Sequence, residues 1–258
     1  FHENLAHITA SDAGGKGVNI SRALTVNGTD NGALVVLGNE NGASFADSLK
    51  ADGMKLCEIY VDGRIRENIT LHTNNAPETR ISFTGFVATD ALIDKVEEML
   101  SDVDSDTVIT LTGSNPKGIT IERVMAMVKN FQAKGARVVI DSRSFSKENL
   151  FASNPWLIKP NEEEIGMYTD IEVTDFATAA KAAKQIRSMG IENVIISSSK
   201  GAVLACAEGT YVANAPKITV ASTIGAGDSS IAGFLASHLA MIIFCWLPPE
   251  KLTAKRSG

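Results

Sequence analysis

Near the carboxyl end of the chain, a glycine-containing turn leads directly into an apolar, helix-like run. The turn reads Gly225, Ala226, Gly227 and Asp228. Glycines let the backbone approach a ligand closely, and the start of a helix offers unpaired N–H groups and a positive dipole to an anion. The pattern predicts a phosphate site with a carboxylate beside it. A structural interpretation is also open, because aspartate is a preferred N-cap residue of helices.

A second glycine motif lies near the amino end, where Gly14, Gly15, Lys16 and Gly17 precede Asn19. Apolar residues at helical spacing follow it, so these glycines also stand just before a predicted helix. Such a motif is typical either of a ligand-binding turn or of a flexible loop with a solvated lysine.

Two more segments between these motifs carry recognisable patterns. Residues 111–118 read Leu-Thr-Gly-Ser-Asn-Pro-Lys-Gly, and residues 156–164 read Trp-Leu-Ile-Lys-Pro-Asn-Glu-Glu-Glu. Together and in this order, the four segments resemble the signatures of the ribokinase-like PfkB family of carbohydrate kinases. The resemblance runs from about Glu3 to about Leu239 and covers nearly the whole chain.

Apolar runs that are typical of buried strands alternate with helical patterns along the chain. The predicted strands are residues 33–37, 107–111, 137–140, 156–158 and 193–196, and the clearest predicted helices are 120–134 and 174–189. Strands that are apolar on both faces favour a mostly parallel sheet covered by helices, with ligands at the carboxyl ends of the strands. Residues 67–73 and 79–83 break this rhythm and predict a hairpin.

The resemblance implies the same class of fold, a ribokinase-like three-layer α/β/α sandwich with a small β-sheet lid. We expect residues 14–54 and 87–258 to form the α/β core, and residues 1–13 and 55–86 to supply the lid. In the family, this lid covers the sugar site and often pairs across a dimer. A homodimer through the lid is therefore expected.

The resemblance also implies roles for individual residues in ATP- and Mg²⁺-dependent phosphoryl transfer. Asp228 would be the general base, and the backbone N–H groups of Gly225, Ala226 and Gly227 would hold the transferring phosphoryl group. The residues expected to bind the sugar are Gly14, Gly15, Lys16, Asn19, Arg66 and Asn68. Those expected near the nucleotide phosphates and Mg²⁺ are Asn161, Glu164, Ser197, Gly201 and Thr223. No residue is assigned as a direct metal ligand, since Mg²⁺ is seldom caged by protein alone.

Two of these assignments have structural alternatives. Asn161 and Glu164 stand at a spacing that is common at helix starts. Arg66 could be a lid arginine that faces water, although a guanidinium group suits the phosphate of a phosphosugar well.

The expected substrate is a phosphorylated ketohexose. Residues 64–70 resemble the phosphosugar branch of the family, and residues 82–89 and 155–161 look most like the bacterial 1-phosphofructokinases, which phosphorylate the 6-hydroxyl of fructose 1-phosphate. Alternatives within the family are tagatose-6-phosphate kinase and 6-phosphofructokinase. An alternative of another class is a truncated, catalytically silent protein that binds sugar phosphate.

Three segments depart from the family pattern. The family's first strand, with its Asn-Pro-Ala-x-x-Asp segment, is absent, and Ile242–Pro249 stands where further helices are usual. Residues 196–202 lack the first glycine of the nucleotide loop, which also looks one residue shorter. We expect a fragment or a reading frame altered near its end.

Composition narrows the class of protein further. The chain has 258 residues, of which 44% are hydrophobic, and a formal net charge of −6. This charge, without a long basic run, argues against a nucleic-acid partner. Cys57, Cys206 and Cys245 show no metal-ligand spacing, which fits a reducing cytoplasm.

The run Ile231–Leu247 is almost entirely apolar. It approaches the length of a membrane span, but a helix that follows a phosphate loop is normally buried against the sheet. We therefore expect a buried helix and no membrane.

Overall fold

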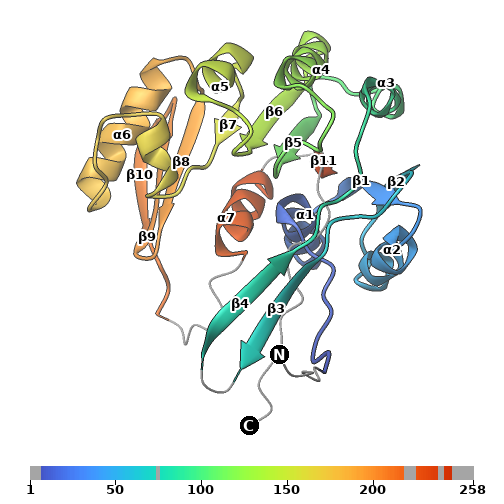
Figure 1. The fold of residues 1–258 in the computed structure, drawn as a ribbon. Coiled ribbons are helices and arrows are strands. Elements are labelled where there is room, and N and C mark those ends of the chain that lie inside the picture. Colours follow the sequence, from blue (N-terminus) through green and yellow to red (C-terminus); the bar gives the residue numbers. More distant parts are fainter. Residues whose placement is uncertain (1–6, 74–75, 218–224, 238–240, 246–258) are drawn as a thin grey trace.

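The computed structural model describes residues 7–73, 76–217, 225–237 and 241–245 (Figure 1). The helices are α1 (Lys16–Val26), α2 (Gly42–Ala51), α3 (Asp90–Met99), α4 (Ile121–Ala133), α5 (Lys147–Ser153), α6 (Phe176–Ser188) and α7 (Ala226–Leu235), with a 3₁₀ turn at Glu164–Met167. The strands are β1 (Asn31–Gly38), β2 (Leu56–Val61), β3 (Asn68–Thr73), β4 (Ala76–Ser82), β5 (Val108–Thr112), β6 (Arg137–Asp141), β7 (Leu157–Ile158), β8 (Asn193–Ser198), β9 (Gly201–Cys206), β10 (Gly209–Asn214) and β11 (Met241–Cys245).

Nine of these strands form one sheet in the order β10-β9-β8-β7-β6-β5-β11-β1-β2. From β8 across to β2, all neighbouring strands of this sheet pair in parallel. At the other end of the sheet, the β8-β9 and β9-β10 pairings are antiparallel. Because parallel strands end at the same edge, the residues that follow β5, β6 and β7 lie along one side of the sheet.

Alternating side chains of the central strands supply two separate hydrophobic cores. On β6, Val138 and Ile140 pack with α2 to α6, whereas Val139 packs on the opposite face with α1 and α7. Ile195 on β8 likewise belongs to the α1/α7 face, between neighbours that belong to the other face. This alternation on a sheet buried on both sides produces a three-layer α/β/α sandwich. The expected fold class is confirmed.

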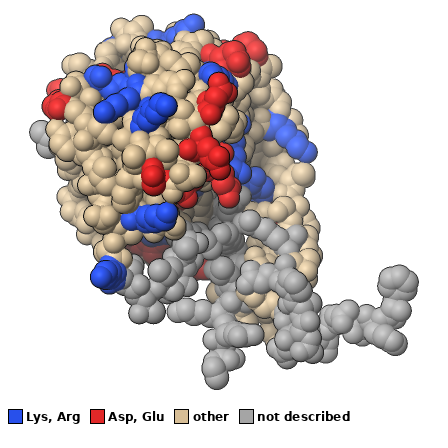
Figure 2. Space-filling model, turned by 90° about the vertical axis from the view of Figure 1, so that its left-hand side faces the viewer, with Lys and Arg blue, Asp and Glu red and all other residues tan. Residues whose placement is uncertain are grey.

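The predicted strands and helices of the core are found within one or two residues of their expected bounds. Thr120 caps α4 by accepting a hydrogen bond from the Arg123 N–H group, and Asp175 forms a capping box with Thr178 at the start of α6. Such side chains satisfy backbone N–H groups that have no partner inside a helix. Charged side chains of both signs are interspersed over the face that carries α6 and β10 (Figure 2).

The predicted hairpin forms a sheet of its own. β3 and β4 pair antiparallel, from Asn68 opposite Ser82 to Thr73 opposite Ala76, and project from the core (Figure 1). The expected lid boundary at residue 55 is wrong, because Leu56–Val61 is β2, the edge strand of the large sheet. In the segment 1–13, the described residues 7–13 contain no strand.

The apolar run Ile231–Leu247 is not one continuous helix. Helix α7 ends at Leu235, and Met241–Cys245 forms β11, which lies between β1 and β5 and pairs in parallel with both. Among the described residues, no helix is long and apolar enough to cross a membrane.

Gly118, the last residue of the Leu111–Gly118 segment, lies where two stretches of backbone touch. Its φ is +92°, and a Cβ placed on it would lie 2.1 Å from the Ala88 carbonyl oxygen. We expect Gly118→Ala to lower the free energy of unfolding by at least about 1–3 kcal/mol, because the strained conformation and the clash add. Denaturant unfolding measures this change. Gly233→Ala is the matched control, since Gly233 is helical with no atom within 4 Å of the added Cβ; an equal loss in both variants would contradict the argument.

Candidate active site

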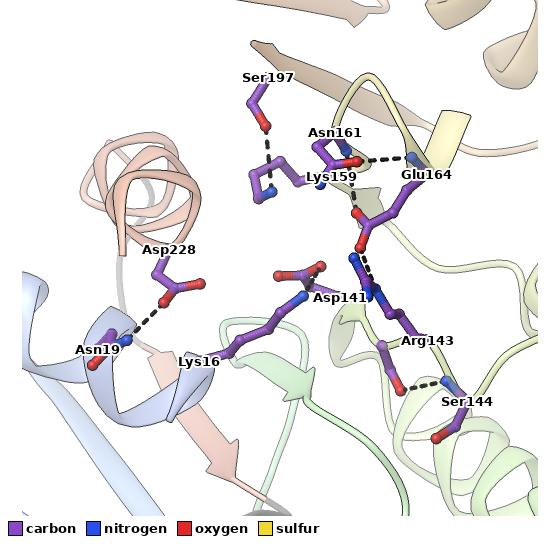
Figure 3. Close-up of polar contacts among 11 residues, drawn as sticks. Lys16, Asn19, Asp141, Arg143, Ser144, Lys159, Asn161, Glu164, Ser197 and Asp228 are labelled. Carbon is purple, nitrogen blue, oxygen red and sulfur yellow. Dashed lines mark hydrogen bonds and ion pairs between the residues drawn. The ribbon is translucent and has the colours of Figure 1, made fainter. Parts of the chain in front are cut away.

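The two glycine motifs meet at the starts of α1 and α7. The Asn19 side-chain amide donates a hydrogen bond of 2.8 Å from Nδ2 to Oδ2 of Asp228, 209 residues later in the chain (Figure 3). Ile20 and Leu24 of α1 pack in one core with Ile231 and Leu235 of α7, so the two helices are held side by side. The motifs therefore share one site.

Backbone geometry explains the glycine at the start of each helix. Gly15 precedes α1 with a φ of 136°, and Gly225 precedes α7 with a φ of 81°. Residues with a Cβ atom rarely adopt such φ angles. The N–H groups of the first turn of α7 are unpaired within the helix, and they form a ready-made site for an anion beside Asp228.

Asp228 is 8% exposed and lies in the first turn of α7. Burial raises the pKa of its carboxyl group above the ordinary value, although the hydrogen bond from Asn19 and the charges of Lys16 and Lys159 oppose this rise. Asn19 is itself oriented by Arg22, whose Nη1 donates to Asn19 Oδ1 at 3.5 Å. A carboxylate with a raised pKa is a stronger base than an ordinary aspartate.

The acid limb of the pH profile tests this arrangement. Replacing Asn19 with leucine removes a hydrogen bond that lowers the pKa of Asp228, so we expect the acid limb of kcat/KM to move to higher pH. Asn27→Leu, at the exposed end of the same helix, should leave the limb in place. A limb that stays fixed or moves to lower pH in Asn19→Leu would contradict the role of this hydrogen bond.

Lys16, at the start of α1, reaches the end of β6. Its ammonium group lies 2.9 Å from Oδ1 of Asp141, the last residue of that strand. The side chain of Asp141 is 5% exposed, and among the described residues its other oxygen, Oδ2, is buried without a hydrogen-bond partner.

Lys159 follows β7 and is 5% exposed. Its ammonium group lies 3.5 Å from Oγ of Ser197 on β8. A Cβ placed on Gly227 would lie only 2.9 Å from the same ammonium nitrogen. The glycine in the first turn of α7 thus leaves room for a buried cation at the anion site. Lys159 adds positive charge where the helix start already favours an anion.

Asn161 and Glu164 form a reciprocal pair after β7. The Asn161 N–H group donates to Glu164 Oε2 at 3.2 Å, and the Glu164 N–H group donates to Asn161 Oδ1 at 2.7 Å. Arg143 Nε donates to the other carboxylate oxygen at 2.8 Å. Burial raises the pKa of Glu164, but these hydrogen bonds outweigh it and the pKa lies below its ordinary value.

A small hollow lies beside this pair, lined in part by Asp141, Lys159, Glu164 and Tyr168. Burial, together with the charges of Glu164 and Asp141, raises the pKa of Tyr168 to about 12, so the hollow holds a neutral phenol beside its carboxylates. Carboxylate oxygens of this kind suit a hard cation.

The structure brings most of the expected site residues together, but not all. Arg66 and Asn68 lie at the base of the hairpin, where Asn68 is buried and pairs with Ser82. Gly201 lies at the start of β9, with a φ of +146° and its Cα packed against the Ala213 backbone. The roles of these three residues stay predictions, and Thr223 lies outside the described residues.

Asp141, Lys159 and Arg143 are site residues that the sequence analysis did not assign. Asp141 closes an apolar strand, which is the position where α/β proteins place functional side chains. Lys159 belongs to the Lys-Pro-Asn segment used to recognise the family, but a lysine there carries no signal of burial. Arg143 has a largely exposed side chain, and nothing in its local sequence marks it.

Comparisons with known proteins identify the family to which the chain belongs. The model of the pfkB family of carbohydrate kinases matches residues 3–241. The 1-phosphofructokinase of Vibrio cholerae is 32% identical over 232 residues, which cover 88% of this chain and 72% of that protein. The 1-phosphofructokinase of Escherichia coli K12 is 30% identical over 237 residues, which cover 90% and 75%.

Solved structures show the same fold. Phosphofructokinase-2 from Escherichia coli in complex with substrates and products superimposes with a TM-score of 0.76 at 25% identity, covering 87% of this chain and 75% of that one. A phosphofructokinase described as putative, from Staphylococcus aureus, gives a TM-score of 0.75 at 28% identity, covering 88% and 75%. The architecture is thus ribokinase-like. With a matching family model, curated relatives and this shared fold, the chain belongs to the pfkB family of carbohydrate kinases, phosphotransferases that act on a hydroxyl acceptor.

Proposed function

We propose that this chain transfers the γ-phosphoryl group of ATP to the 6-hydroxyl of fructose 1-phosphate. The observation that carries the proposal is the hydrogen bond between Asn19 and Asp228, because it joins the expected sugar site to the expected base and anion site. A hydroxyl held by the first motif would meet a phosphoryl group held by the second.

Each part of the site has a task in this reaction. Asp228 would take the proton from the attacking 6-hydroxyl, and the N–H groups of Gly225, Ala226 and Gly227 would bind the oxygens of the transferring phosphoryl group. Lys159, beside Gly227, would stabilise the negative charge of that group. Phosphoryl transfer needs mainly such positioning and charge neutralisation.

The residues present also fit the Mg²⁺ ion that accompanies ATP. The unpartnered oxygen of Asp141 and the carboxylate of Glu164, oriented by Asn161, would hold the ion at the hollow. Mg²⁺ usually keeps several waters and phosphate oxygens as ligands, so one or two carboxylates suffice to hold it. When bound, the ion neutralises charge on the phosphates of ATP.

The sugar would lie between α1 and the hairpin. Gly14 and Gly15 would let the backbone approach its hydroxyl groups, and Lys16 would add positive charge near its phosphate. Arg66 and Asn68, at the base of the hairpin, would bind the phosphate already present on the sugar. A bidentate guanidinium contact would favour phosphorylated over free sugars.

The choice of substrate rests on the curated relatives, which are 1-phosphofructokinases at about 30% identity. The structural likeness to Escherichia coli phosphofructokinase-2 keeps 6-phosphofructokinase as an alternative, and tagatose-6-phosphate kinase is the third.

A coupled assay of ADP release ranks these candidates. Fructose 1-phosphate, fructose 6-phosphate, tagatose 6-phosphate and free fructose are compared by kcat/KM with MgATP. We expect fructose 1-phosphate to have the highest kcat/KM. A higher kcat/KM for another phosphosugar would overturn the assignment of the substrate. A higher kcat/KM for free fructose would overturn the role of Arg66. Calorimetry with the same sugars separates a kinase from a silent binder, since a silent binder would bind fructose 1-phosphate without turnover.

The hairpin also offers a surface for a second copy of the chain. Ile81 and Phe83 are 41% and 49% exposed, although both are large apolar residues. We infer a homodimer through β3 and β4. Light scattering tests it, and a monomer for the unmodified chain would contradict it.

A further inference from the structure

The ion pair between Lys16 and Asp141 connects the sugar side of the site with the metal side. Lys16 starts the helix of the first glycine motif, and Asp141 ends β6, beside Glu164 and the hollow. Figure 3 shows the lysine stem running from α1 toward Asp141, away from the Asn19–Asp228 pair. The cation expected to meet the sugar phosphate is therefore held by a carboxylate of the metal site.

The position of the Lys16 ammonium group depends on the nearby carboxylates that attract it. Burial lowers the pKa of Lys16, but the charge of Asp141, their hydrogen bond, and the charges of Glu164 and Asp228 raise it above its ordinary value. Lys16 is thus a cation on a flexible four-carbon stem that contacts Asp141 and is also attracted by the charges of Glu164 and Asp228. Such a group moves to whichever anion is least neutralised by other cations.

A divalent cation at the hollow would change that balance. Asp141 has one oxygen on Lys16 and one buried oxygen without a hydrogen-bond partner among the described residues, and its side chain lines the hollow together with Glu164. A cation bound there neutralises the carboxylate and weakens its hold on Lys16. The lysine is then available to the phosphate of the sugar.

We propose that Asp141 is a positioning residue that exchanges Lys16 for the divalent cation, and that this exchange couples the two substrates. The inference rests on the proposed function. It states that the metal–nucleotide complex raises the affinity for fructose 1-phosphate because it releases Lys16. By linkage, the sugar phosphate must raise the affinity for the metal–nucleotide complex by the same factor.

Calorimetry measures the coupling without turnover, because MgADP cannot phosphorylate the sugar. The Kd of fructose 1-phosphate is determined alone, with ADP and EDTA, and with MgADP. For the wild-type chain we expect MgADP to tighten binding by about 5- to 150-fold, the usual range of such coupling, and ADP with EDTA to have little effect.

Two variants test the exchange from opposite ends. Asp141→Asn should abolish the coupling and, because Lys16 is already released, should bind fructose 1-phosphate alone about fivefold or more tightly than the wild type. A residue with only a metal-binding or structural role would leave that affinity unchanged or lower it. Lys16→Met should also abolish the coupling but should bind the sugar phosphate more weakly, and it keeps the test decisive if Asp141→Asn does not fold.

The matched control is Glu97→Gln, which changes a carboxylate that pairs with Arg123 between α3 and α4. We expect wild-type coupling in this variant. Wild-type coupling in Lys16→Met, or weaker sugar binding by folded Asp141→Asn, would overturn the exchange. If the wild-type chain bound none of the phosphorylated ketohexoses, the proposed function itself would fail; binding without any effect of MgADP would refute the exchange alone.

Discussion

Asp228→Asn is expected to lower kcat by about 10²- to 10⁴-fold, the usual contribution of a general base. Asparagine keeps the size of the side chain and can still accept the hydrogen bond from Asn19, but it cannot take the proton of the attacking hydroxyl. Steady-state kinetics with fructose 1-phosphate and MgATP measures the change. The KM of the sugar should change far less than kcat, because the sugar contacts are retained.

The same substitution should not destabilise the protein. Burial raises the pKa of Asp228 in the folded state, so the unfolded chain loses this proton at lower pH than the folded chain does. The free energy of unfolding therefore falls as the pH rises through the folded-state pKa, and at neutral pH the whole cost of the buried charge is present. Asparagine carries no such charge, and we expect a Tm at or above that of the wild type at pH 7.

These two measurements together separate catalysis from folding. A large loss of kcat with an unchanged or higher Tm supports a general base. Asp12→Asn, at an exposed aspartate before the first glycine motif, is the control and should keep both values. If Asp228→Asn kept full turnover, Asp228 would be only a helix-start residue.

Local sequence patterns predicted the central strands correctly, because these strands are surrounded by apolar residues on both faces. β5, β6 and β8 are buried on both faces, so their apolar runs identify them without any knowledge of the neighbours. β2 is an edge strand in which only Ile59 is buried and the other residues are exposed or half-buried, so it lacks the continuous apolar run of a central strand and resembles a lid strand. β11 follows an apolar helix, and only Ser237 and His238 interrupt the apolar sequence between the two elements, which is too weak a signal to mark the change from helix to strand.

The candidate site also has a part that local sequence predicted and a part that it did not. The glycine motifs were recognisable because the positive φ of Gly15 and of Gly225 is a local requirement of the turn. The partners of Lys16 and Gly227 were not, because Asp141 and Lys159 reach them only through the order of the strands in the sheet. Local sequence carries the conformation of a loop, whereas the pairing of distant charges depends on the completed fold.

Lys159→Met is expected to lower kcat by about 10²- to 10³-fold, comparable to the loss of one donor from an oxyanion hole. The ammonium group of Lys159 is buried next to Gly227, at the helix start that would hold the transferring phosphoryl group. Charge stabilisation is strongest where water is excluded, so removing this cation should raise the barrier to transfer. Methionine has a similar length and should fill the same space.

The kinetic pattern distinguishes this role from a structural one. Because Lys159 lies at the phosphoryl site and not at the hairpin, the KM of the sugar phosphate should stay within a few-fold, while kcat falls. Lys129→Met, on the exposed face of α4, is the matched control and should behave like the wild type. A folded Lys159→Met protein with kcat within tenfold of the wild-type value would exclude Lys159 from stabilising the transition state. The anion site would then consist of the α7 backbone and the metal ion alone.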